Sequence, residues 1–104
     1  MQTLKRGLAP KHAGIIFKEM IIDELPRMSV SAAAKALGVS PAHLGEVTKG
    51  EASITPKLAV KIAFTTKTSA KMWLDMQENY DLWHAENSPE FTGGLIEGSL
   101  ALAY

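Results

Sequence analysis

The segment from Ser40 to Lys49 holds the side chains whose types are best suited to binding chemistry. Ser40 precedes Pro41, a typical helix start, because the serine oxygen accepts a backbone N–H and proline has no N–H to satisfy at the first helical position. The polar side chains of His43, Glu46 and Lys49 follow. Since the N-terminus of a helix attracts anions, this segment indicates contact with the phosphates and base edges of a nucleic acid.

The candidate DNA contacts divide by chemistry. We expect Ser40 and nearby backbone N–H groups to bind a phosphate, His43 to reach a base edge or a phosphate, and Lys49 to bind a phosphate. Pro41 and Ala42 are suited to a thymine methyl group. The alternative for each polar residue is a solvated surface position without a role. The predicted set is Ser29, Lys35, Ser40, Pro41, Ala42, His43, Gly45, Glu46 and Lys49.

The same segment lacks the side chains that read bases best. It contains no Arg, Asn or Gln, the residues suited to bidentate contacts with guanine or adenine. Gly45 costs about 1 kcal/mol of helix stability and removes one possible base contact. Glu46 repels phosphates unless it faces the amino group of cytosine or a cation. We therefore expect sequence-specific affinity to be low or to depend on DNA shape.

A pair of short helices must position this segment. Ser29 predicts the start of an alanine-rich helix over 30–37, and Gly38 stands where a helix-ending residue adopts the left-handed region. A second helix is expected over 41–48, with Leu44 and Val47 facing inward. Two helices joined by so short a turn form a helix-turn-helix, whose second helix enters the major groove. Ser29 and Lys35 then lie near the DNA backbone.

Hydrophobic periodicity predicts three further helices. The first covers 12–24 and ends at Pro26. The fourth in chain order begins at Thr55 and Pro56 and precedes a polar break over 65–68, and the fifth runs from Ser69 to about residue 85. The predicted fold is all-α, a five-helix repressor-like domain over 12–85 between a basic arm (1–11) and an irregular tail (86–104). The expected inward positions of the first and fourth helices are Ile16, Phe17, Met20, Ile21, Leu25, Leu58, Ala59, Ile62 and Ala63.

The fifth predicted helix carries an aromatic stripe made of Trp73, Met76, Tyr80 and Trp83. Such a stripe is more often core than binding surface, but its area is large for so small a chain. We therefore expect part of it to form a dimer or partner interface. A twofold dimer through this helix sets two recognition helices about 34 Å apart, one turn of DNA.

Composition narrows the function classes. The net charge is zero, but residues 1–61 hold nine Lys and Arg against five Asp and Glu, whereas residues 62–104 hold two against six. This asymmetry fits one surface facing phosphates, with chance as the alternative. There is no cysteine, and no nucleophile–base pair, phosphate loop or carboxylate pair is visible. The histidines lack carboxylates at ligand spacing. We expect no enzyme, metal, cofactor or membrane span, and a cytoplasmic protein.

The helix-turn-helix resembles that of the phage-repressor (Xre) superfamily and, within it, the HigA/VapI antitoxins. The resemblance covers residues 10–85 and rests on the segments 12–14, 36–40, 54–56, 73–77 and 80–83. It implies a five-helix dimer that neutralises a HigB-type, mRNA-cleaving toxin and represses the shared operon by binding double-stranded operator DNA. The alternatives are a stand-alone phage- or plasmid-type repressor, and a protein-interaction module that binds DNA only weakly.

Overall fold

Short helices joined by tight turns make up the part of the chain that the structure, a computed structural model, describes, residues 8–89. In chain order they are α1 (Ala13–Phe17), the π-helical η2 (Lys18–Ile22) that continues it, α2 (Val30–Leu37), α3 (Pro41–Thr48), α4 (Pro56–Thr66) and α5 (Ala70–Glu86). Residues 8–89 contain no strand, so the all-α prediction is confirmed. Most of the predicted arm (1–7) and tail (90–104) lies outside the described residues.

Local capping chemistry sets the helix boundaries as expected. The side-chain oxygens of Ser29, Ser40, Thr55 and Ser69 each accept a backbone N–H in the first turn of the following helix. This satisfies one of the N–H groups that a helix start leaves without a partner. The predicted bounds of α2 and α3 are confirmed. The fourth helix extends to Thr66, into the segment expected to be a polar break.

The first helix departs from the prediction. After Phe17 the chain forms a π-helical turn, in which the N–H of Asp23 bonds the carbonyl of Lys18 at 2.8 Å. This wider turn brings Ile22, five residues after Phe17, into the core, where it is 3% exposed. Met20 and Leu25, which a regular α-helical period placed inside, are 54% and 45% exposed. The helix also ends at residue 22 instead of 24.

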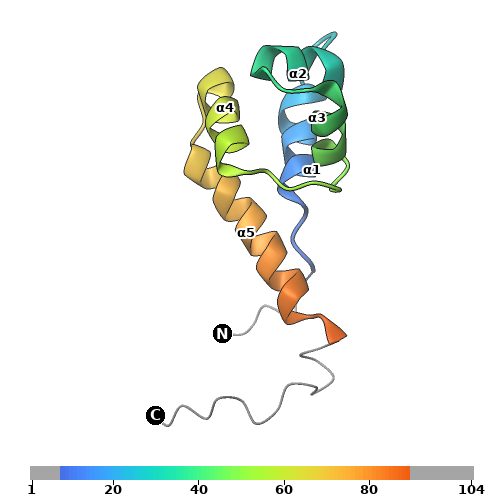
Figure 1. Cartoon of the computed structure of the whole chain (residues 1–104), viewed down its shortest axis with the longest axis vertical. Helices are drawn as coiled ribbons and strands as arrows, with labels where there is room; N and C mark the ends of the chain where they lie inside the picture. The colour runs from blue at the N-terminus through green and yellow to red at the C-terminus, as the bar shows by residue number, and fades with distance from the viewer. Residues whose placement is uncertain (1–7, 90–104) are drawn as a thin grey trace.

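One core joins all the helices. α1 packs against α3 and α5, α2 against α3 and α4, and α4 against α5. In Figure 1 the helix-turn-helix (α2 and α3) lies beside α1, while α5 runs away from this body, so that its C-terminal half extends beyond the other helices. The buried apolar residues are Ala13, Phe17, Ile22, Ala33, Ala34, Leu37, Leu44, Val47, Ile54, Leu58, Ala59, Ile62 and Trp73.

Trp73 belongs to this core, which corrects one expected interface position. Its side chain is 0% exposed, its ring meets Phe17 edge-on at 5.8 Å, and its indole N–H donates to the Thr68 hydroxyl at 2.7 Å. A side chain buried by its own chain cannot reach a partner. The outward apolar residues of α5 are instead Met72 and Leu82, which are 36% and 50% exposed.

Candidate nucleic-acid interface

The start of α3 is built to face outward. Ser40 Oγ accepts the backbone N–H of His43 at 3.1 Å, and Pro41 occupies the first turn. Leu44 and Val47 are both 0% exposed and fix the inner side of the helix. The opposite side is therefore held toward solvent with its remaining N-terminal N–H groups, an arrangement that favours an anion.

The turn between α2 and α3 is tightly closed. Gly38 lies in the left-handed region at φ 71°, the N–H of Val39 bonds the carbonyl of Ala34 at 3.0 Å, and that of Gly38 bonds Lys35 at 3.2 Å. These two bonds form a Schellman motif, which satisfies carbonyls at the end of a helix. Lys61 of α4 donates to the Gly38 carbonyl at 3.2 Å, so a third helix also holds the turn. The angle between α2 and α3 is fixed by these contacts.

Gly14 lets α1 reach the backbone of α3. A Cβ at this position would come within 2.7 Å of the carbonyl carbon and Cγ1 of Val47, and closer still to the carbonyl oxygen. Only a residue without a side chain fits there. Because Val47 lies in the last turns of the recognition helix, this contact sets how deeply α3 sits against the body.

A buried polar network links α1, the loop before α4, and α5. His12 Nδ1 accepts the backbone N–H of Gly14 at 2.8 Å and so caps α1. Gln77 Oε1 accepts the N–H of Ile54 at 2.9 Å, its amide nitrogen donates to Asp81 at 3.1 Å, and the same nitrogen lies 3.4 Å from His12 Nε2. The network ties the helix-turn-helix body to α5.

The same network changes the acid–base behaviour of His12. Burial lowers the pKa of its imidazole below the usual value, and the charge of Asp81 opposes this in part. A neutral ring keeps the Nδ1 lone pair that the cap requires. The ring of Tyr80 lies between two histidines, edge-on to His12 with centroids 4.9 Å apart and tilted against His84 with centroids 4.3 Å apart. Asp81 acts on His12 only through its charge, and residues 8–89 hold no group of three His, Cys, Asp or Glu suited to a metal.

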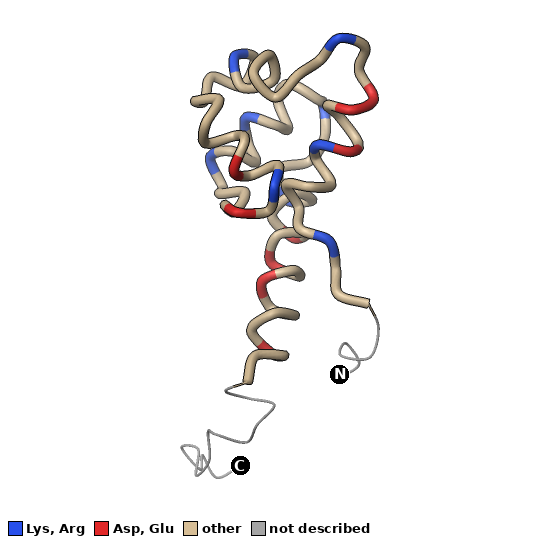
Figure 2. Tube along the Cα trace, turned by 90° about the vertical axis from the view of Figure 1, so that its right-hand side faces the viewer, with Lys and Arg blue, Asp and Glu red and all other residues tan. Residues whose placement is uncertain are grey.

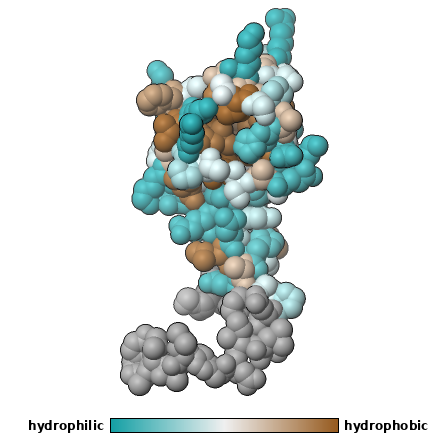
Figure 3. Space-filling model, in the orientation of Figure 1, coloured by the Kyte–Doolittle hydropathy of each residue, from teal (hydrophilic) through white to brown (hydrophobic). Residues whose placement is uncertain are grey.

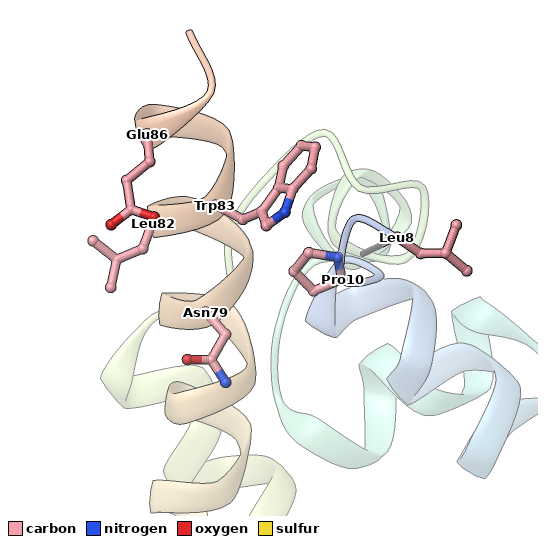
Figure 4. Close-up of a pocket in the computed structure, with 6 residues that line it drawn as sticks. All are labelled: Leu8, Pro10, Asn79, Leu82, Trp83 and Glu86. Carbon is pink, nitrogen blue, oxygen red and sulfur yellow. The ribbon is translucent and has the colours of Figure 1, made fainter. Parts of the chain in front are cut away.

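The far end of α5 forms a second surface. Trp83 points from α5 toward Pro10 of the N-terminal segment, while Leu82 lies on the outer side of the helix (Figure 4). Pro10, Leu82 and Trp83 line a pocket of about 360 Å³ together with Leu8, which is 95% exposed. Asn79 and Glu86 also line this pocket, and the part of the chain around it, with Leu8, Leu82 and Trp83, is here called the α5 tip, which is separate from the helix-turn-helix.

The structure places the predicted site residues on three elements. The nine candidate DNA contacts lie on or beside α2 and α3, and all are exposed except half-buried Gly45. Of the expected interface residues, Met76 packs against the core and Tyr80 and Trp83 are half-buried. Figure 2 shows acidic positions along the projecting stem of α5, and at the start of the same helix Lys71 pairs with Asp75 at 2.9 Å. No helix within 8–89 has the length and apolar character needed to cross a bilayer.

Sequence reasoning missed Gly14, Gln77 and the cap formed by His12. A glycine three residues into a helix and a glutamine four residues after Trp73, within the apolar stripe, were the available signals. Neither points to its partner, because those partners lie 23 to 65 residues away along the chain.

Curated relatives cover most of the chain, although no protein-family model matches it. An uncharacterized HTH-type transcriptional regulator, YddM of Escherichia coli K12, is 32% identical over 85 residues, 82% of this chain and 87% of that protein. Virulence-associated protein I of Dichelobacter nodosus is 34% identical over 86 residues, 83% of this chain and 79% of its own length.

Solved structures agree in fold. The antitoxin GraA superimposes with a TM-score of 0.78 at 26% identity, over 88% of this chain and 98% of that one. The antitoxin HigA of Pseudomonas aeruginosa, solved with the higBA promoter, gives a TM-score of 0.75 at 26% identity, over 86% and 98%. Taken with the relatives, these matches show that the chain belongs to the HigA/VapI-type branch of the Xre helix-turn-helix family, a family of antitoxins and transcriptional regulators and not of enzymes.

Proposed function

We propose that the chain is the antitoxin of a HigBA-type module, which represses its own operon by binding operator DNA as a dimer and neutralises a HigB-type, mRNA-cleaving toxin. The observation that carries the proposal is the capped, outward-facing start of α3, in a chain whose fold matches an antitoxin solved with promoter DNA. A protein with this role acts in the cytoplasm, where the operon is.

The exposed residues of α2 and α3 take the DNA roles. Ser40 and the first N–H groups of α3 bind one phosphate, and Lys49 binds another directly after the helix. His43 and Glu46 reach base edges, while Ser29 and Lys35 contact the backbone from α2. Each of these side chains is exposed. Pro41, Ala42 and Gly45 allow close approach of bases because they carry little or no side-chain volume beyond the helix backbone.

Dimerisation uses the α5 tip. Leu82, which is 50% exposed, and the half-buried Trp83 lie on a part of α5 that projects beyond the body (Figure 1) and offer apolar area to a second copy. Pairing two copies there about a twofold axis buries this area and joins two copies of α3 in one assembly. Repression follows because the dimer covers the promoter. We assign residues 12–86 to this domain, with 1–11 as a basic arm.

A second candidate, a protein-interaction module with weak DNA binding, is favoured by one apolar surface. Phe17, Ile21, Leu25 and Leu37 line a groove of about 130 Å³ between α1, η2, α2 and α4. Figure 3 shows apolar side chains gathered on this part of the body. Phe64, at 83% exposure, lies on α4. Such a surface is suited to a protein partner and not to phosphates.

Fluorescence anisotropy distinguishes the two candidates. A labelled duplex from the region upstream of this gene is compared with a scrambled duplex of equal composition, at two salt concentrations. Binding at least about a thousandfold tighter to the native duplex supports the repressor. Equal and steeply salt-dependent binding to both duplexes contradicts it and supports the interaction module. Co-expression with the neighbouring reading frame then tests the toxin partner, which must co-purify and lose its mRNA cleavage.

A further inference from the structure

The exposed side of α3 presents one long acceptor at its centre. Leu44, Val47 and Thr48 are buried, and at 3.6 residues per turn Ala42 and Glu46 lie directly opposite them. Gly45 lies beside this pair, and a Cβ there would meet nothing within 4 Å. Because Ala42 and Gly45 are short, the carboxylate of Glu46 is the long acidic acceptor of this face, and the exposed Lys49 follows it just after the helix.

No ion pair within residues 8–89 neutralises this carboxylate. The ion pairs of residues 8–89 join Lys11 to Glu19, Lys18 to Asp23 and Lys71 to Asp75, and none includes Glu46. No side-chain hydrogen bond to Glu46 is present in this part of the chain either; only its backbone carbonyl accepts, from Glu51 and Lys49. Docking α3 in a major groove therefore brings an unpaired negative charge against the bases.

Such a charge accepts hydrogen bonds and donates none. In the major groove, guanine offers two acceptors, thymine offers an acceptor and a methyl group, and adenine pairs its amino donor with an adjacent acceptor. Cytosine offers an amino donor alone. A carboxylate held at the centre of the recognition face therefore finds a hydrogen-bond donor at cytosine, whereas the acceptor atoms of the other bases repel it.

We propose that Glu46 determines the sequence specificity of this interface by accepting a hydrogen bond from a cytosine N4 amino group in each half-site and by repelling other sequences. This inference rests on the proposed operator binding and adds how the operator is chosen. Specificity then arises largely from rejection, since a difference between two affinities can be made by penalising the wrong partner. It also accounts for a recognition helix without Arg, Asn or Gln.

Two variants of one residue and a matched control test the proposal. Glu46→Gln keeps the side-chain shape and removes the charge, and Glu46→Ala removes the acceptor. Glu51→Gln removes the same charge five residues away, from an exposed position outside α3. For each protein, anisotropy gives the affinity for the native upstream duplex and for the scrambled duplex at fixed salt.

We expect both Glu46 variants to bind the scrambled duplex more tightly than wild type. The ratio of native to scrambled affinity should fall by roughly 5- to 150-fold, the discrimination of one good base contact. Glu51→Gln should leave that ratio unchanged. Selection from randomised duplexes should enrich cytosine at one position per half-site for wild type, and adenine at that position for Glu46→Gln, because glutamine pairs with adenine.

The outcomes separate this inference from the function on which it rests. Wild-type protein that prefers the native duplex, with a ratio unchanged in both Glu46 variants, contradicts the role of Glu46 and leaves the repressor standing. An equal fall in the ratio for Glu51→Gln also overturns it, because general charge repulsion then explains the effect. Wild-type protein that binds both duplexes alike overturns both.

Discussion

Replacing Gly14 with alanine tests the close approach of α1 to the recognition helix. The added Cβ would lie within 2.7 Å of Val47 backbone and side-chain carbon atoms, where real Cβ contacts do not occur. The obstacle is the backbone of α3 and not the flexible end of a side chain. The structure can accommodate the methyl group only by moving one helix away from the other.

The magnitude follows from two opposing effects. Alanine stabilises a helix by about 1 kcal/mol relative to glycine. Forcing an extra methyl group into a packed contact costs typically 1–3 kcal/mol and occasionally more, and a backbone obstacle places Gly14→Ala at the upper end or beyond. We expect a net loss of about 2 kcal/mol in the free energy of unfolding, which lowers Tm by roughly 8–16 °C in a domain of this size.

A second glycine in the same fold supplies the control. Gly45→Ala also exchanges glycine for alanine within a helix, but its Cβ meets nothing within 4 Å. Only the helix preference remains, so we expect stability to rise by about 0.5–1 kcal/mol. Thermal unfolding followed by circular dichroism, at one protein concentration for all three proteins, measures both changes.

Opposite signs for the two glycines support the packing described above. A Tm for Gly14→Ala equal to or above that of wild type refutes the close contact between α1 and Val47. DNA binding measured well below Tm adds a second readout, because displacing α1 tilts α3. We expect Gly14→Ala to weaken binding to the native duplex even where it remains fully folded.

Three further predictions concern the turn, the buried histidine and the phosphate contact. Gly38→Val should lower Tm sharply and abolish DNA binding, because a β-branched residue does not tolerate φ 71°; unchanged melting would contradict the assignment. Because burial lowers the pKa of His12, the unfolded chain binds more protons than the folded one just below the ordinary histidine pKa of about 6.5. Stability should therefore fall as pH drops below that value, and less so in His12→Asn, which keeps a capping side chain; identical pH profiles of Tm would exclude this role. Lys49→Ala should weaken binding to every DNA sequence about equally and reduce the salt dependence of binding by about one phosphate contact, and loss of the specific complex alone would argue against a phosphate role.

The features that could be predicted from sequence are those set by near neighbours. Ser29, Gly38 and Ser40 define the helix-turn-helix because each acts on backbone groups at most four or five residues away. The DNA contacts proposed for α3 follow from the same local pattern, and their exposure agrees with it. They stay predictions, since exposure alone does not select a ligand.

The features that escaped prediction depend on distant contacts. A π-helical turn buries Ile22, which the regular α-helical period did not place inside, while Ile21 is partly buried against the core. Trp73 is buried because α1 supplies Phe17, more than fifty residues earlier in the chain. Likewise, Gln77 serves as a link only because the fold brings His12 and Ile54 to it.

The Gln77 network bears on the spacing between the two copies of α3 that a dimer would present along DNA. Gln77 bonds the loop that follows α3 and lies against the cap of α1, so these contacts hold α5 in a defined position relative to α3. In a twofold dimer formed through the α5 tip, the distance between the two copies of α3 would then be set by the fold of each single chain. For the proposed dimer, such a fixed arrangement would lower the entropic cost of binding an operator, because less ordering is needed on binding. The position of α3 relative to the proposed dimer interface is therefore set within each chain, before a second copy or DNA is bound.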